Sequence, residues 1–256
     1  MAMLVDIGNT RIKWARLTGG RLVERGSAVH RDSLDAAIAA FGAALLTHPT
    51  QIVAANVAGE AIAARLRALV AARPGASLEL VATTAERFGV RCAYADPDRL
   101  GVDRWVAMLA AYHAARGAAC VIDAGTAVTF DAIDKAGTHL GGLIFPGARL
   151  LAAALDRNTS DIGVTTATAD VPRGLDLLGR NTDAAVGNGA CLALAAVLDR
   201  ASAVVARALG TTPVVYLTGG DAQALRGWLE TRVELRSDLV LEGLALFAAS
   251  RSQEGS

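Results

Sequence analysis

Two stretches of the sequence decide the fold: Leu4-Val5-Asp6-Ile7-Gly8-Asn9-Thr10 and Val121-Ile122-Asp123-Ala124-Gly125-Thr126-Ala127. Each is an apolar run that ends in an aspartate and passes into a turn containing glycine. In each case the alternation that follows predicts two more strands, so that a buried strand opens a three-stranded antiparallel meander. The same strand-turn-strand unit at the head of two successive parts of the chain indicates an internal repeat.

The segments around these stretches complete an α/β pattern. Apolar runs and alternation predict strands, and Ala- and Leu-rich amphipathic runs predict helices. In the first half we expect strands at 3–6, 11–17, 22–29, 51–56 and 78–82, and helices at 35–46, 60–72 and 103–115. In the second half we expect strands at 119–123, 127–133, 139–145 and 214–217, and helices at 149–155, 182–209, 222–230 and 238–249.

The restart of the pattern near Arg116-Gly117 predicts two α/β halves, 1–116 and 117–256. A segment rich in Ser, Gly or Pro does not mark this boundary, so we expect the halves to pack closely. The predicted fold class is therefore α/β, duplicated, with mixed sheets.

The composition argues against a disordered chain and against a general nucleic-acid binder. With 53% hydrophobic and 20% charged residues in 256, the chain is globular and long enough to bury a large core. Lys+Arg and Asp+Glu are both 25, so the basic surface expected of a general nucleic-acid binder is missing. Aromatic residues make up only 4%, which argues against a base-stacking platform. We expect no nucleic-acid partner.

Cysteine usage and hydropathy predict a cytoplasmic protein. Cys92, Cys120 and Cys191 are widely spaced and form no CxxC pair, so they are interpreted as small buried hydrophobes in a reducing compartment. The N-terminus lacks the charged and apolar regions of a secretory signal. The most apolar stretch, 184–198, is shorter than the roughly 20 residues of a membrane span, so we expect no membrane association.

The two turns have the chemistry of phosphate binding. A glycine two residues after an acid lets the backbone approach a bulky anion, and the N–H groups of such a turn form an anion-binding nest. Asn9, Thr10 and Lys13 add further donors. Since a carboxylate repels phosphate, the role expected for the acid is to hold a metal, directly or through water. Tight hairpins also use Asp and Gly for structural reasons, but two such turns suggest two phosphate grips facing one cleft.

A third segment, Leu217-Thr218-Gly219-Gly220-Asp221, ends a strand and opens a helix at Ala222. A glycine pair there would let a flat nucleoside lie against the backbone, and a helix N-terminus favours anions. An ordinary strand-to-helix turn is the alternative interpretation.

With these three segments the chain resembles the acetate kinase, hexokinase, actin and heat-shock chaperone superfamily of ATP-binding folds. More narrowly, it resembles type III pantothenate kinase in four motifs and a fifth match, in which Arg180 stands where Lys is common. They are 6–10 (DIGNT), 101–104 (GVDR), 123–131 (DAGTAVTFD), 141–147 (GGLIFPG) and 179–182 (GRNT). The segment 150–154 departs from the family, which often has a serine there.

The resemblance implies two actin-like (ribonuclease H-like) domains with ATP in the cleft between them. It implies ATP-dependent phosphorylation of pantothenate to 4′-phosphopantothenate, the first step of coenzyme A biosynthesis. The implied cofactors are ATP, Mg²⁺ and a monovalent cation, K⁺ or NH₄⁺. The implied assembly is a homodimer with the substrate pocket at its interface.

The resemblance also assigns residues. A hydroxyl nucleophile needs a carboxylate to orient it and take its proton, and Asp103 is the expected base; the alternative is a plain helix cap. Arg104 beside it is the expected cation for the substrate carboxylate, and Asp123 is the expected monovalent-cation ligand. The expected substrate contacts are Tyr94, Gly101, Val102, Asp103, Arg104 and Thr182. The expected ATP contacts are Asp6, Ile7, Gly8, Asn9, Thr10, Arg11, Ile12, Lys13 and Thr126.

Two other functions remain open at this point. A kinase for another small hydroxy or carboxy acid, or a phosphatase of the same superfamily, would share the phosphate turns and differ around Asp103 and Arg104. An ATP-binding accessory factor in transcription is a non-enzymatic alternative. Zero net charge argues against direct DNA binding, and an intact Asp103 loop argues against a degenerate site.

Overall fold

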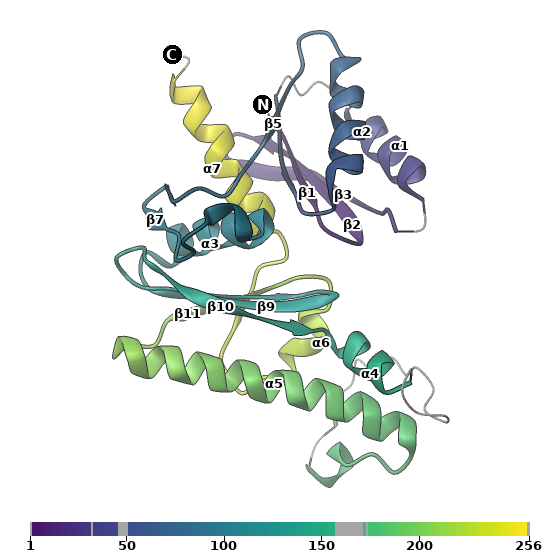
Figure 1. The fold of residues 1–256 in the computed structure, drawn as a ribbon, viewed down its shortest axis with the longest axis vertical. Helices are drawn as coiled ribbons and strands as arrows, with labels where there is room; N and C mark the ends of the chain where they lie inside the picture. The colour runs from purple at the N-terminus through teal and green to yellow at the C-terminus, as the bar shows by residue number, and fades with distance from the viewer. Residues whose placement is uncertain (1, 32, 46–50, 157–170, 173, 255–256) are drawn as a thin grey trace. The chain divides into compact units, whose positions relative to one another are not determined.

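The computed structural model describes residues 2–31, 33–45, 51–156, 171–172 and 174–254. The chain forms two compact units, and each is described here by itself. Unit 1 comprises Met1–Ala110 and Asp238–Ser256, and unit 2 comprises Ala111–Ser237. Each unit is built on one five-stranded sheet with helices packed against it (Figure 1).

The sheet of unit 1 has the strand order β3-β2-β1-β4-β5. The first three strands are antiparallel neighbours, and β1, β4 and β5 run parallel. Helices connect the parallel strands, as crossover connections require. The elements are β1 (Ala2–Ile7), β2 (Arg11–Thr18), β3 (Arg21–Val29), α1 (Leu34–Ala44), β4 (Gln51–Asn56), α2 (Glu60–Ala71) and β5 (Ser77–Leu80).

The sheet of unit 2 repeats this topology as β10-β9-β8-β11-β12: β10, β9 and β8 are antiparallel neighbours, and β8, β11 and β12 run parallel. The repeat inferred from the two opening stretches is thus present as an identical strand order. The elements are β8 (Ala119–Ala124), β9 (Ala127–Ile133), β10 (His139–Pro146), α4 (Ala148–Asp156), α5 (Thr182–Leu209), β11 (Val214–Thr218), α6 (Ala222–Arg226) and β12 (Glu234–Leu235).

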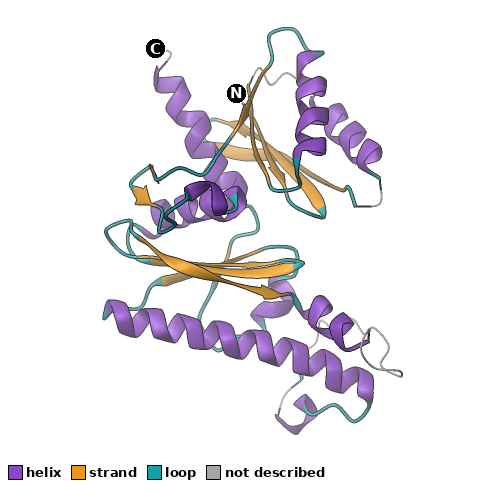
Figure 2. Ribbon diagram, viewed as in Figure 1, coloured by secondary structure: helices purple, strands orange, loops and turns teal. Residues whose placement is uncertain are grey.

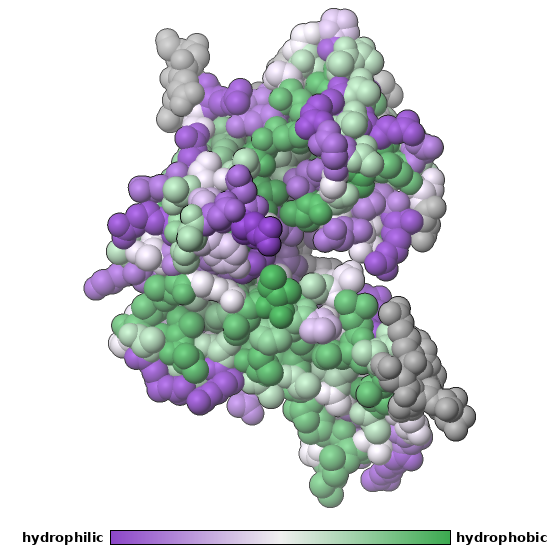
Figure 3. All heavy atoms as spheres, in the orientation of Figure 1, coloured by the Kyte–Doolittle hydropathy of each residue, from purple (hydrophilic) through white to green (hydrophobic). Residues whose placement is uncertain are grey.

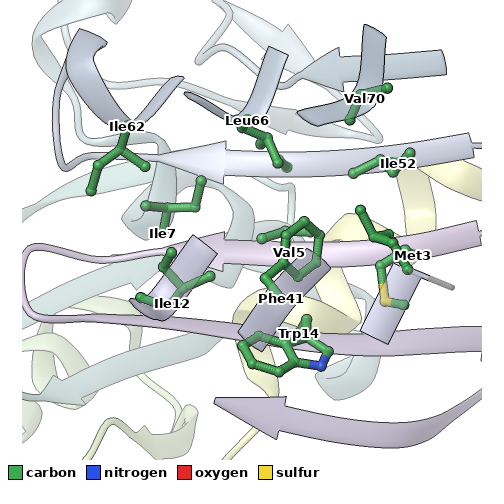
Figure 4. Packing of buried hydrophobic residues seen from close by; sticks show 13 residues of the cluster. Met3, Val5, Ile7, Ile12, Trp14, Phe41, Ile52, Ile62, Leu66 and Val70 are labelled. Atoms are coloured by element: carbon green, nitrogen blue, oxygen red, sulfur yellow. The ribbon is translucent and has the colours of Figure 1, made fainter. Parts of the chain in front are cut away.

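The core of unit 1 lies between its sheet and the helices α1 and α2. Apolar side chains of β1, β2 and β4 with the same parity point at these helices (Figure 4). Trp14 packs edge-to-face on Phe41 with the ring centroids 5.6 Å apart. The cluster includes Met3, Val5, Ile7, Ile12, Trp14, Phe41, Ile52, Ile62, Leu66 and Val70.

The C-terminal helix α7 (Leu239–Glu254) belongs to unit 1, although the sequence places it in the second half. It packs against β1, β2 and β4, and side chains of the opposite parity, such as Leu4 and Val53, are fully buried. The predicted boundary at 116/117 therefore differs from the observed division, which falls within α3 (Val102–Ala115) and again before Asp238. The physical reason is that α1 and α2 cover only one face of the sheet, and a second helical layer removes the other face from water.

Helix α5 is, among the described residues, the one helix long and apolar enough by length and composition to cross a membrane. At 28 residues it exceeds the apolar stretch 184–198 on which the length argument rested. It nevertheless packs Leu194 and Leu198 into a cluster with the sheet residues Phe130 and Leu217. Its role in the structure is that of the main core helix of unit 2.

Helix ends agree with local capping chemistry. Ser33 and Asn181 accept hydrogen bonds from the main chain of Ala36 and Ala184, and Gly210 ends α5 with φ 64°. The bounds of β4, β9 and α5 are those predicted, whereas α6 stops four residues before the predicted end at Glu230. The predicted end of the first helix at Leu46 lies outside the described residues.

A hairpin that the sequence pattern did not predict lies in the connection between β5 and α3 (Figure 2). Strands β6 (Glu86–Arg87) and β7 (Val90–Arg91) pair around Phe88 and Gly89, which have φ 48° and 78°. Two positive φ values are typical of a type I′ turn, which normally uses Asn-Gly or Asp-Gly. Phenylalanine in this position carries no turn signal, so the hairpin could not be found from composition.

Candidate active site

The first turn, Gly8–Thr10, joins β1 to β2 and is closed by backbone bonds and one side chain. The Gly8 N–H donates to the Arg11 carbonyl at 3.1 Å, and the His30 N–H donates to the Thr10 carbonyl at 3.1 Å. His30 Nε2 also lies 2.7 Å from the Gly8 carbonyl, which can only accept, so Nε2 carries the proton. His30 therefore helps to close this turn.

Strand register places an acid beside a cation at this turn. Asp6 pairs with Lys13 across β1 and β2, and directly opposed residues of an antiparallel pair project from the same face. The two side chains therefore leave the sheet together, on the face opposite to Ile7 and Ile12. Both are half-buried. A lysine can contact phosphate here while a carboxylate holds a cation.

The structure separates the predicted ATP contacts of the first turn into buried and accessible side chains. The side chains of Ile7 and Ile12 are each only 1% exposed and belong to the core, so only their main chain could reach a ligand. Arg11 is exposed and donates to Ser27 Oγ at 3.0 Å. Asn9 is exposed and Thr10 half-buried. The accessible donors are therefore the turn backbone, Asn9, Thr10 and Lys13.

Asp103 lies in the first turn of α3, two residues after Gly101. Its Oδ1 accepts a hydrogen bond from the Arg104 N–H at 2.8 Å. A Cβ on residue 101 would lie 2.7 Å from Asp103 Oδ1, so a side chain at 101 would displace the carboxylate. The glycine in the GVDR motif is thus explained by the space that this carboxylate occupies.

The Asp103 loop is close to the end of the first turn's strands. Val57 directly follows β4, and its N–H donates to the Ile7 carbonyl at 3.0 Å. A Cβ on Gly101 would contact Val57 Cγ1 at 4.0 Å. The loop therefore approaches the carboxyl ends of β1 and β4, the edge where ligands bind in open α/β sheets. Within unit 1 the predicted base and the predicted phosphate turn lie at the same edge.

Tyr94 and Arg104 form a second predicted pair that the structure brings together. Arg104 is 8% exposed. Its Nη1 donates to the Tyr94 hydroxyl at 3.3 Å, and its Cζ lies 5.9 Å from the centre of the Tyr94 ring. A guanidinium ordered in this way is a fixed cation, suited to a carboxylate ligand. Val102 is half-buried.

The second turn, Gly125–Thr126, joins β8 to β9 in unit 2 and is built from glycine backbone. The Gly125 N–H donates to the Ala127 carbonyl at 3.1 Å, and the Gly147 N–H donates to the Thr126 carbonyl at 2.9 Å. A Cβ on residue 147 would lie 2.5 Å from the Gly125 carbonyl oxygen. Thr126 is exposed on this turn, where its side chain can reach a ligand.

Asp123 is half-buried and is surrounded by hydroxyl and backbone groups. It pairs with Thr129 across β8 and β9 and with Thr218 across β8 and β11. Gly219, with φ 99°, crowds this carboxylate: a Cβ there would lie 2.6 Å from the Ala124 carbonyl carbon and even closer to Asp123 Oδ1. Oxygen donors of this kind suit a hard cation.

The Thr218–Asp221 segment borders a cavity of about 180 Å³ in unit 2. The Asp221 N–H donates to the Ala124 carbonyl at 2.8 Å, and the Asp221 carboxylate pairs with Arg149 of α4. Apolar side chains of the sheet, α5 and α6 form the other walls. The lining residues are Ala124, Gly125, Val128, Ala148, Arg149, Cys191, Leu194, Asp221, Ala224 and Leu225.

Thr182, the remaining predicted substrate contact, is exposed at the start of α5 in unit 2. Asn181 caps the helix by accepting from the Ala184 N–H at 2.8 Å. A Cβ on Gly179 would lie 2.6 Å from the Ala185 Cα, which explains the glycine of this motif. Thr182 and the Asp103 loop belong to different units, so their juxtaposition stays a prediction.

A buried polar pair lies behind the second turn and was not anticipated. Asp131 and His139 are each 1% exposed, and His139 Nε2 lies 3.1 Å from Asp131 Oδ1. Nearby, burial raises the pKa of the Cys120 thiol to about 12, and the Asp131 charge adds to the shift. The last residue of the DAGTAVTFD motif is thus an interior group and not a ligand contact.

Two sheets of identical order, each opening on an aspartate and a glycine turn, define the duplicated actin-like α/β fold. Solved structures of low sequence identity share this fold. Component A of (R)-2-hydroxyglutaryl-CoA dehydratase from Acidaminococcus fermentans is 14% identical, with a TM-score of 0.58 over 98% of both chains. A Campylobacter jejuni protein named for a Baf family of transcriptional activators is 19% identical, with a TM-score of 0.60 over 98% of this chain and 99% of that one.

Sequence comparison identifies the particular family. The family model for type III pantothenate kinase matches residues 2–204. A type III pantothenate kinase from Nitrosococcus oceani is 36% identical over 99% of this chain and 96% of its own length. The chain belongs to the type III pantothenate kinase family.

Proposed function

We propose that the chain transfers the γ-phosphoryl group of ATP to the primary hydroxyl of pantothenate, giving 4′-phosphopantothenate and ADP in the first step of coenzyme A biosynthesis. A bond forms between the hydroxyl oxygen and the γ-phosphorus, the bond from that phosphorus to the oxygen of ADP breaks, and the hydroxyl proton leaves to a base. The observation that carries the proposal is family membership along nearly the whole chain.

Asp103 is proposed as the base. Phosphoryl transfer goes through a loose transition state, so the protein mainly positions the reactants and neutralises charge. A carboxylate at the start of α3, beside Gly101 and near the carboxyl ends of β1 and β4, is well placed to orient a hydroxyl toward a phosphate held at the first turn. Its hydrogen bond from the Arg104 N–H fixes the orientation of the carboxylate.

Arg104 and Tyr94 are proposed to hold the pantothenate carboxylate. A buried guanidinium loses less conformational entropy on binding when it is already ordered. The Tyr94 hydroxyl supplies that order through its 3.3 Å contact. Gly101, Val102 and Thr182 are proposed as the remaining substrate contacts.

ATP is proposed to bind through both turns. The backbone of Gly8–Thr10 with Asn9 and Lys13 would hold phosphate in unit 1, and Thr126 would do so in unit 2. The cavity beside Gly125 and Asp221, at about 180 Å³, has the size and apolar walls for a nucleobase.

The donor set fits the two cations that the family resemblance implies. Among the described residues there is no group of three or more His, Cys, Asp or Glu that could cage a metal. Mg²⁺ is commonly bound by one or two carboxylates together with substrate phosphates and water, which suits Asp6. Mg²⁺ would neutralise charge on the transferred phosphoryl group. K⁺ or NH₄⁺ is proposed to bind at Asp123, near the hydroxyls of Thr129 and Thr218.

A homodimer is proposed on the basis of exposed apolar surface in unit 2. Figure 3 shows apolar side chains gathered on the visible face of this unit. On the edge strand β10, Leu143 and Ile144 are 44% and 62% exposed, and on α5 Leu192 is 44% exposed. An uncovered apolar edge strand favours association. Ile144→Lys should give a monomer by light scattering; a monomeric wild type, or an unchanged dimer in the variant, would contradict this interface.

The cytoplasm is the proposed location. Cys92, Cys120 and Cys191 are free thiols, as expected in a reducing compartment.

One assay tests the proposed reaction. Purified protein is incubated with ATP, Mg²⁺, K⁺ and pantothenate, and 4′-phosphopantothenate is sought by mass spectrometry while ADP is followed by a coupled assay. Product at one equivalent per ADP is expected. ADP release with another hydroxy acid and not with pantothenate would assign a different kinase, and phosphate release without acceptor would assign a hydrolase.

A further inference from the structure

The C-terminal helix α7 contacts the chain on both sides of the proposed substrate residue Tyr94, at the β6–β7 hairpin and at α3. The segment between β5 and α3 runs from Val81 to Gly101 and includes Tyr94. All of it, and α7, belong to unit 1. The residues of α7 lie outside the span 2–204 that the family model matches.

The first contact is a close crossing of α7 and α3. A Cβ on Gly243 would lie 2.9 Å from the Val106 carbonyl carbon and closer still to its oxygen. Only glycine allows the two helix backbones to approach so closely. Val106 lies two residues after Arg104 in the same helix, so this crossing determines where the start of α3 stands.

The second contact joins α7 to the β6–β7 hairpin. Phe247 is 6% exposed, and its ring packs edge-to-face on Phe88 with the centroids 4.9 Å apart. The Arg87 guanidinium covers both rings, at 4.7 Å from the Phe88 centroid and 5.7 Å from that of Phe247. Phe88 has φ 48°, a conformation that costs a bulky residue free energy. The aromatic contact offsets this cost and holds the turn in place.

Hydrogen bonds connect the hairpin to the proposed substrate residues. The Cys92 N–H donates to the Ala85 carbonyl at 2.8 Å, and the Tyr94 N–H donates to Cys92 Sγ at 3.4 Å. Thr83 Oγ1 donates to the Leu100 carbonyl at 2.9 Å and closes the segment into a loop. The Tyr94 hydroxyl then meets Arg104.

We infer that Phe247 and Phe88 are positioning residues for pantothenate: they hold the hairpin so that Tyr94 orders the Arg104 guanidinium. This inference rests on the proposed function. Neither ring belongs to the cluster that packs the sheet of unit 1 against α1 and α2. Loss of the contact should weaken pantothenate binding and leave ATP binding unchanged.

The test compares Phe247→Leu with Phe41→Leu, a matched control. Phe41 is also buried and edge-to-face with another ring, but it lies on α1 in the main core. In Phe247→Leu we expect faster amide hydrogen exchange across residues 83–101 and a KM for pantothenate raised about tenfold, with an unchanged KM for ATP. In Phe41→Leu we expect a lower melting temperature without either change.

A second variant keeps the test independent of folding. Phe88→Asn suits the left-handed turn and removes the ring, so the hairpin can form while its anchor to α7 is lost. Raised KM for pantothenate in this variant supports the inference. Unchanged exchange and KM in both variants, or equal changes in Phe41→Leu, would overturn it. If the wild-type protein does not phosphorylate pantothenate, the proposed function fails, and the exchange comparison alone still decides whether α7 holds the hairpin.

Discussion

The two turns occupy the same place in two sheets of identical order, yet they are closed differently. In the first turn a side chain, His30, binds the Gly8 carbonyl, and a Cβ on Gly8 would make an ordinary contact of 3.6 Å with the Arg11 carbonyl. In the second turn a Cβ on the corresponding glycine, Gly125, would also make only an ordinary contact, 3.5 Å from the Ala127 carbonyl oxygen. Gly147 and Gly219, however, lie against the backbone of this turn with no room for a Cβ. The turn therefore has the same position in both sheets, but different contacts hold it in place.

The carboxylates of the two turns also differ in their surroundings. Asp6 is opposite Lys13, whereas Asp123 is flanked by Thr129 and Thr218. An acid beside a lysine suits a metal and phosphate together, and an acid among hydroxyls suits a cation alone. We propose that the two turns bind different cations; the proposed substrate loop with Asp103 belongs to unit 1.

The largest effect, a loss of turnover, is expected from substitution of Asp103 in the proposed substrate loop. Asp103→Asn should lower turnover by about 10²–10⁴-fold, the usual contribution of a general base, while nucleotide affinity is kept because both turns are intact. Steady-state kinetics and nucleotide titration measure the two quantities. The neighbouring exposed Asp98→Asn is the control and should stay near wild type. Near wild-type turnover in Asp103→Asn would show that Asp103 is not the base.

The next prediction compares the two turns through the loss in the free energy of unfolding when a glycine of each is replaced. Gly219→Ala places a side chain at φ 99° against Asp123 and Ala124, and we expect a loss of about 3 kcal/mol in the free energy of unfolding. Gly8→Ala meets only an ordinary contact and should change stability by less than about 1 kcal/mol. Urea unfolding measures both. Equal losses in the two variants would mean that the turns are held alike.

The two turn carboxylates, Asp6 and Asp123, are expected to bind different cations. Asp123→Ala should lower activity and weaken the dependence on K⁺ or NH₄⁺ by roughly tenfold, equivalent to about 1.4 kcal/mol for one lost ionic contact. Asp6→Asn should instead weaken Mg²⁺-ATP binding and leave the monovalent-cation response as in the wild type. Activity titrated with KCl at fixed Mg²⁺-ATP distinguishes them, and an unaltered KCl response in Asp123→Ala counts against the cation site.

The smallest effect is expected in stability at high pH, and it concerns β1 and β8, the strands that precede the two turns. Cys120 in β8 takes the place of Met3 in β1, counting back from the two aspartates. Its folded pKa of about 12 is raised from 9.0 by burial and by Asp131. The unfolded thiol ionises more readily, so stability is complete below pH 9 and falls as the pH rises toward 12.

At pH 10 this loss should be about 1.4 kcal/mol. The measurement is the difference in unfolding free energy between pH 8 and pH 10 for the wild type and for Cys120→Ala. The variant lacks the thiol and should lose correspondingly less. The same fall in both proteins would show that Cys120 does not titrate in this way.

Local patterns carried much of the fold. The bounds of β4, β9 and α5 followed from apolar runs, alternation and the cap at Asn181, because those signals act within a few residues. The hairpin at Phe88 was not predicted, since its left-handed turn packs against Phe247, which is far away in the sequence. For the same reason nothing local indicated that α7 returns to unit 1.

The candidate site divides in the same way. Residue identity and spacing along a short length of chain are enough to find the two Asp-x-Gly turns, the GVDR motif and the family. The folded unit is needed to show that Ile7 and Ile12 point into the core, that Tyr94 contacts Arg104, and that Gly219 lies against Asp123. Those facts depend on strand parity and on packing between distant segments, where a side chain's neighbours are set by the whole unit and not by its own stretch of sequence.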